Sequence, residues 1–178
     1  LLLGVGALCL GSGCSDLGYY RQSVGGHLDL MSRAKPVDDW LAQADVAPTL
    51  KQRLALAKKM REFSVQVLKL PDNRSYRGYA DLQRPAAVWN VVAAPPLSLT
   101  LKTWCYPVTG CVGYRGYFDR AEADTLAAQL RVQGMDVNVY GVQAYSTLGW
   151  SNWIGGDPLL NTFVNGSEGE LARLIFHE

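Results

Sequence analysis

The 178-residue sequence lacks an excess of charge of either sign. Seventeen Lys and Arg stand against sixteen Asp and Glu, which leaves a formal net charge of +1. A chain without a strong positive field is a poor match for nucleic acid. Charged residues make up only 19% of the sequence and hydrophobic residues 48%, so the composition of a disordered chain is excluded as well. We expect a folded protein that does not bind nucleic acid.

The sequence also lacks the short motifs of several large enzyme classes. It contains no G-x-S-x-G elbow, no P-loop and no G-x-G-x-x-G between a strand and a helix, which argues against serine hydrolases and nucleotide-binding enzymes. It has only two histidines, His27 and His177, so any imidazole chemistry depends on one of them. His27 is the weaker candidate, because an ordinary polar contact explains it better than a functional role.

The first fourteen residues carry no charge. Residues 1–10 are an apolar run and residues 11–13 are small, as in the apolar region and cleavage site of a signal peptide. The run is too short for a membrane span, which needs about 20 apolar residues. Cys14 after small residues resembles a bacterial lipobox, in which the cysteine is lipidated. We therefore predict a leader over residues 1–14 and one domain over residues 15–178. The alternative is a buried N-terminal strand or a truncated helix.

Two further cysteines, Cys105 and Cys111, stand close together between strand-like runs over residues 97–104 and 112–118. A disulfide across the mouth of this hairpin fits an oxidising compartment, and it would contribute roughly 2 kcal/mol. The alternative is that they are two of four zinc ligands, but the sequence lacks the second close pair that such a site requires.

The hydrophobic pattern predicts a mixture of helices and strands. An amphipathic helix is expected over residues 49–70, followed by strands over residues 86–94, 97–104 and 112–118. The expected buried stripe of the helix is Leu56, Met60, Phe63, Val67 and Leu70. Asp119 with Glu122 predicts the start of a second helix that ends at Gly134, and a strand follows over residues 136–141. This order indicates an α+β domain with no internal repeat.

A last helix is predicted at the end of the sequence. Ser167 and Glu170 form a capping box, and Leu171, Leu174 and Ile175 form the buried side of the helix that follows. His177 and Glu178 come directly after them. By its spacing the Glu178 carboxylate falls on the buried stripe, where an unpaired charge is costly and needs a partner. Taken alone, a His-Glu pair is better explained as a chance dipeptide or a solvated helix end.

Many short blocks of the chain, in order, resemble a bacterial family of predicted aminopeptidases of the zincin superfamily, whose members are secreted or lipid-anchored. The blocks are residues 14–20, 26–30, 70–73, 88–94, 104–105, 110–111, 114–118, 140–142, 144–150, 157–160 and 172–178. In that family the last block continues into H-E-x-x-H. The resemblance implies a zincin-like fold with zinc as cofactor, in which His177 is a zinc ligand and Glu178 is the catalytic glutamate. Histidines four residues apart lie on one helical face, where both can reach one zinc ion.

The resemblance also implies roles for other parts of the protein. The second histidine and a further glutamate ligand would follow Glu178, so we expect this chain alone neither to hold zinc tightly nor to cleave peptides. The strand over residues 137–141 would run beside the active-site helix and pair with extended peptide, with Tyr140 and Tyr145 as substrate-binding residues. A lipid anchor at Cys14 would place the protein on the periplasmic side of the cell envelope, and Ser15 is compatible with the outer membrane.

Three alternatives remain open at this stage. An endopeptidase fits the same chemistry as an aminopeptidase, because no acidic residue is identified that would hold a free substrate amine. A non-catalytic envelope lipoprotein would keep the fold and bind a peptide or a protein partner. A purely structural domain would depend on the Cys105–Cys111 disulfide for folding and would not respond to metal.

Overall fold

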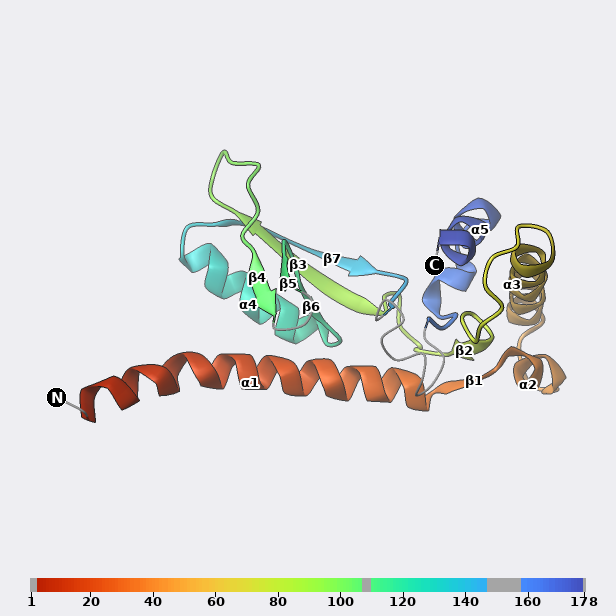
Figure 1. Ribbon diagram of the computed structural model, residues 1–178, viewed down its shortest axis with the longest axis horizontal. Helices are drawn as coiled ribbons and strands as arrows, with labels where there is room; N and C mark the ends of the chain where they lie inside the picture. The colour runs from red at the N-terminus through yellow and green to blue at the C-terminus, as the bar shows by residue number, and fades with distance from the viewer. Residues whose placement is uncertain (1–2, 107–109, 147–157, 178) are drawn as a thin grey trace. The chain divides into compact units, whose positions relative to one another are not determined.

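The computed structural model describes residues 3–106, 110–146 and 158–177, with side chains from residue 17 onward. The chain divides into two compact units (Figure 1). The sheet unit comprises Leu1–Asp29 and Trp89–Tyr140, and the helical unit comprises Leu30–Val88 and Gly141–Glu178. Helices and antiparallel strands are mixed along the chain, which confirms the predicted α+β class.

The sheet unit is built on a three-stranded sheet in the order β6-β3-β7. These strands are β3 (Val88–Ala94), β6 (Arg115–Tyr117) and β7 (Asp136–Val142). Strands β3 and β6 are antiparallel, with Trp89 opposite Tyr117 and Val91 opposite Arg115. Helix α4 (Arg120–Val132) packs on the sheet, and Ala123, Ala127 and Leu130 join the strands in one core.

Helix α4 is bounded by the residues that the sequence predicts, Asp119 before it and Gly134 after it. Asp119 is the N-cap, and its carboxylate accepts a hydrogen bond of 2.6 Å from the Ala121 amide. Beyond the helix, Gly134 has a φ of 80°, a left-handed conformation that glycine adopts without strain. The predicted helix and the strand that follows it are confirmed.

A separate hairpin joins β4 (Trp104–Tyr106) to β5 (Gly110–Val112). The strands are antiparallel and place Cys105 directly opposite Cys111. These two cysteines form a disulfide, which confirms the predicted bond and rules out the zinc-ligand alternative for the bonded pair.

Two strand predictions for this region are wrong. Residues 97–103 are not a strand, although apolar and polar residues alternate there. Leu97 has a φ of 59° directly after two prolines, and its side chain and that of Leu99 are fully exposed. Apolar and polar residues alternate in this segment, but no partner strand pairs with it, so its apolar side chains are not buried. The strand predicted over residues 112–118 is divided into β5 and β6 by Gly113 and Tyr114.

The N-terminal helix α1 (Leu3–Ser32) was not expected beyond the leader. Three glycines at positions 18, 25 and 26 lower its intrinsic helix propensity, and its residues from Tyr19 onward gain contacts with the sheet. Over the residues that the structure describes, no helix has both the length and the apolar character that crossing a membrane requires.

The helical unit encloses a second core between three α-helices, one 3-10 turn and a two-stranded sheet. The α-helices are α2 (Val37–Ala42), α3 (Pro48–Gln66) and α5 (Glu168–His177), and the 3-10 turn is η1 (Thr162–Asn165). Strands β1 (Ala34–Pro36) and β2 (Gly78–Ala80) pair antiparallel. The largest fully buried side chains of this core are Phe163, Leu54, Leu160, Leu171 and Val164.

Helix α3 confirms the predicted helix, but it buries a different face. The buried residues are Leu54, Ala57, Arg61 and Ser64, whereas Phe63 and Val67 of the expected stripe are exposed. Leu56 and Met60 are only partly buried beside the core. The helix turns this way because the Arg61 side chain finds several hydrogen-bond acceptors in the loop that follows the helix.

Candidate functional site

Helix α5, which carries the predicted zinc ligand, begins at a capping box. The Ser167 hydroxyl accepts a hydrogen bond of 3.3 Å from the Glu170 amide, and the Glu170 carboxylate accepts one of 3.1 Å from the Ser167 amide. The Ser167 hydroxyl also donates to the Glu170 carboxylate at 2.9 Å, and this bond, with the one from the Ser167 amide, lowers the pKa of Glu170. The predicted capping box is confirmed, as is the burial of Leu171 and Ile175, whereas Leu174 of the same predicted side is only partly buried.

The structure holds both ends of α5 against the rest of the helical unit. Before the helix, the Arg53 guanidinium donates hydrogen bonds to the carbonyl oxygens of Val164, at 2.7 Å, and Gly166. In the last turn, the Tyr76 hydroxyl donates to the Leu174 carbonyl oxygen at 3.3 Å. The helix that ends at His177 is therefore fixed in position by contacts from two segments distant in sequence.

His177 is the last residue of α5, and its side chain is exposed. Phe176 beside it lies next to Phe63 of α3, with 6.1 Å between the ring centroids. Glu178 lies outside the described residues. Among the residues that the structure does describe, no three His, Cys, Asp or Glu side chains gather into a metal site. Within the described part of the chain, His177 is thus exposed at the end of α5 without two further clustered ligands beside it.

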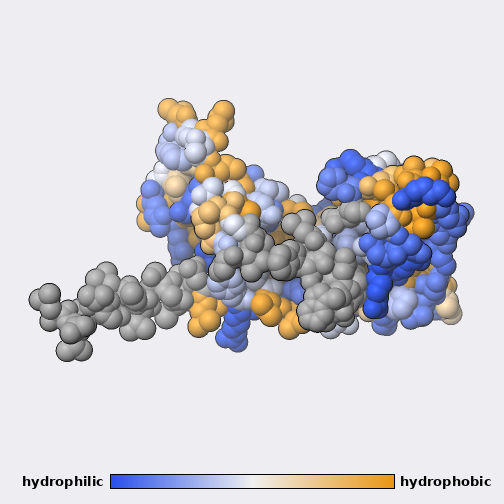
Figure 2. All heavy atoms as spheres, viewed as in Figure 1, coloured by the Kyte–Doolittle hydropathy of each residue, from blue (hydrophilic) through white to orange (hydrophobic). Residues whose placement is uncertain are grey.

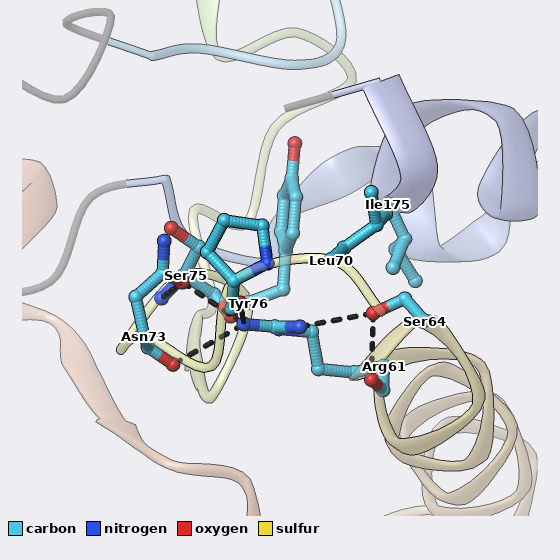
Figure 3. Close-up of a pocket in the computed structure, with 8 residues that line it drawn as sticks. Arg61, Ser64, Leu70, Asn73, Ser75, Tyr76 and Ile175 are labelled. Carbon is cyan, nitrogen blue, oxygen red and sulfur yellow. Dashed lines mark hydrogen bonds between the residues drawn. The ribbon is translucent and has the colours of Figure 1, made fainter. Parts of the chain in front are cut away.

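A buried arginine near α5 was missed by the sequence analysis. Arg61 is only 5% exposed, and its guanidinium lies under the loop over residues 70–76 (Figure 3). It donates to the carbonyl oxygens of Pro71, at 2.9 Å, and Ser75, at 3.0 Å. It also donates to the Asn73 amide oxygen and to the Ser64 hydroxyl, each at 2.9 Å.

No carboxylate is among the described hydrogen-bond partners of Arg61, because Asp72 in the same loop pairs with Arg77 instead. Burial lowers the pKa of the Arg61 guanidinium, and the charge of Arg77 acts in the same direction. Ile175 of α5 and Tyr76 close the small pocket above it (Figure 3). This arrangement orders the loop against α5, and Arg61 belongs to the framework of the site. The signal in the sequence was the spacing of Leu54, Ala57, Arg61 and Ser64 along one helical face.

The other predicted site residues lie in several places. Tyr140 is partly exposed on β7 in the sheet unit, whereas Tyr145 belongs to the helical unit, as does His177. Their role in substrate binding stays a prediction. Cys14 lies within α1, but its side chain is outside the described ones, so its lipidation also stays a prediction.

Comparison with known proteins identifies one family. The model of a family described as "Putative aminopeptidase" matches residues 18–178. No curated protein and no solved structure matches the chain.

Proposed function

The chain belongs to the putative aminopeptidase family, and from this membership we propose that the full-length protein is a zinc-dependent peptidase. The observation that carries the proposal is the position of His177. It is an exposed histidine at the end of a helix that is anchored at both ends, and a glutamate follows it in the sequence.

The residues present fit a zinc site in part. A catalytic zinc needs three protein ligands, and among the described residues His177 is the one proposed as a ligand. The remaining ligands would come from residues that follow Glu178 in the full-length protein. When bound, zinc supplies Lewis-acid chemistry, which polarises the scissile carbonyl and makes a water molecule acidic near neutral pH.

The residues of this chain have separate roles in the proposed reaction. His177 holds the metal, and Glu178 accepts a proton from the attacking water and passes it to the leaving amine. The main chain of β7 pairs with extended peptide, and Tyr140 and Tyr145 contact the substrate. An acylated Cys14 anchors the protein to a membrane on the periplasmic side of the envelope, in the outer membrane if Ser15 directs sorting.

The decisive experiment measures zinc and peptidase activity together in the full-length protein. We expect about one zinc per chain after dialysis, no zinc and no activity in H177A, and retained zinc without activity in E178Q. H27A is the matched control, and it should keep both. A full-length protein that holds no zinc would refute the proposal, and the non-catalytic lipoprotein would then be the better conclusion.

The same assays test two finer statements. The 178-residue chain should hold far less than one zinc and cleave nothing, so a stoichiometric zinc content in it would contradict the proposed ligand set. Aminoacyl fluorogenic substrates that are cleaved only with a free amine identify an aminopeptidase. Equal cleavage of N-blocked peptides would instead identify an endopeptidase.

A further inference from the structure

Helix α1 carries a row of exposed apolar side chains, which we call the outer stripe. It comprises Leu17, Val24 and Leu28, with Tyr20 at its edge, where the Tyr20 ring also contacts that of Tyr106, with 6.4 Å between centroids. Leu17 is 71% exposed, Val24 58% and Leu28 61%. Steps of three and four residues place all of them on one face of the helix. Figure 2 shows apolar atoms along the side of α1 that faces away from the sheet.

The opposite face of the helix is fixed against the sheet, so the outer stripe cannot turn inward. The Tyr19 ring stacks on that of Tyr106, with 5.5 Å between centroids. The Gln22 amide donates to the Gly116 carbonyl oxygen and accepts from the Phe118 amide, both at 3.2 Å.

The space around the glycines of α1 is consistent with the same orientation of the helix. A Cβ at Gly26 would lie 2.1 Å from the Phe118 ring, which means that only glycine allows this close approach. At Gly18 and Gly25, in contrast, a Cβ would have no neighbour within 4 Å. One side of the helix is therefore in tight contact and the other is open.

The charge pattern and the preceding sequence indicate which partner would cover the outer stripe. Arg21 is the only charged residue between Leu17 and Leu28, and helical spacing places it within the stripe. A long cationic side chain among apolar ones suits an anionic lipid surface, because the stem stays in the apolar layer while the guanidinium reaches the headgroups. Helix α1 also carries the uncharged residues 3–10, which belong to the apolar run that precedes the stripe in the sequence.

We propose that the outer stripe of α1 lies in the interface of an anionic lipid bilayer, with the helix parallel to the membrane plane. Interfacial helices of this kind bury an apolar face about 5–10 Å into the boundary between headgroups and acyl chains. The sheet unit is then held directly against the membrane. The proposal requires neither peptidase activity nor acylation. Cys14 precedes Leu17 by three residues, so an acyl group there would add to the same attachment.

The first test measures where the stripe lies when the chain is bound to vesicles. In a C9S/C14S background, which keeps the full chain unacylated, a single V24C residue carries an environment-sensitive NBD fluorophore. L99C, on an exposed connection of the same unit, is the matched control. With vesicles of phosphatidylethanolamine and phosphatidylglycerol, we expect a several-fold rise in emission and quenching by brominated lipid at position 24 only. Vesicles of phosphatidylcholine alone should bind less, since Arg21 then lacks anionic partners.

The second test removes the apolar side chains. L17Q/V24Q/L28Q should partition into the same vesicles at least about tenfold more weakly than the parent chain. The control L97Q/L99Q/L101Q also replaces three exposed apolar residues, but outside the stripe, and should bind as the parent does. Glutamine is a good helix former, so both variants should keep the far-UV circular dichroism of the parent.

Three results would overturn the proposal. A bound chain whose label at position 24 stays in water would show that residues 1–10 alone hold the membrane. A label already shielded without vesicles, together with a dimeric mass, would show that a second copy covers the stripe. Equal loss of vesicle binding in both triple variants would show that the outer stripe contributes no more to membrane binding than other exposed apolar residues do.

Discussion

Replacing Arg61 by methionine should destabilise the helical unit more than any exposed arginine replacement. Methionine keeps much of the apolar stem but removes the guanidinium. The carbonyl oxygens of Pro71 and Ser75 and the Ser64 hydroxyl then lose this donor. The Asn73 amide oxygen keeps only its bond from the Ser75 amide. Because the Arg61 side chain is almost fully buried, water does not replace these bonds without opening the loop.

The loss in the free energy of unfolding depends on how many acceptors lose the Arg61 hydrogen bond. Deleting one hydrogen bond to a charged group costs about 1.5–3 kcal/mol, and leaving a buried acceptor unsatisfied costs about 1–3 kcal/mol. Partial rehydration of the loop lowers the sum, so we expect the free energy of unfolding to fall by about 4 kcal/mol. Arg61→Lys should lose about half as much, because an ammonium group keeps the charge but does not span the separate acceptors.

Urea unfolding followed by far-UV circular dichroism measures both changes. Arg77→Met is the matched control, since Arg77 pairs with Asp72 and both side chains are more than half exposed. An exposed pair contributes less than about 1 kcal/mol. If Arg61→Met were no more destabilising than Arg77→Met, the anchoring of the loop by a buried cation without a carboxylate partner would be refuted.

Three further predictions concern other contacts. Gly26→Ala should cost about 2–3 kcal/mol because its Cβ meets the Phe118 ring, whereas Gly25→Ala should be neutral or slightly stabilising, as thermal unfolding will show. Cys105→Ser should cost roughly 2 kcal/mol and should not affect metal content. The folded state lowers the pKa of Glu170, so its capping contribution is complete above the ordinary glutamate pKa and is lost as the pH falls below it. The loss of stability between neutral pH and about pH 3 should therefore be smaller in Glu170→Gln, and an unchanged pH profile would contradict this.

Features that depend on neighbours in sequence were predictable. The capping box of Ser167 and Glu170, the Asp119 cap and the left-handed Gly134 all appear as expected, because each needs only residues within one helical turn. The disulfide was predictable for the same reason, since the two cysteines flank one short hairpin.

Features that depend on distant segments were not predictable. The buried face of α3 includes Arg61 because the following loop turns its carbonyl oxygens toward it, and hydrophobicity alone favoured Phe63 and Val67 instead. Helix α1 was missed because contacts with the sheet offset its glycines. His177 was singled out through the resemblance and not through the helix, since an exposed histidine at a helix end has no distinguishing local pattern.

The contact between Gln22 and β6 also bears on self-association. Strand β6 is at an edge of its sheet, and unpaired main-chain groups at such an edge can template pairing with another chain. The Gln22 side chain occupies the Gly116 carbonyl and the Phe118 amide, which are the groups that an added strand would use. Helix α1 thus protects this edge against aggregation, and the protein should be most prone to form intermolecular β-structure whenever that helix is detached from the sheet.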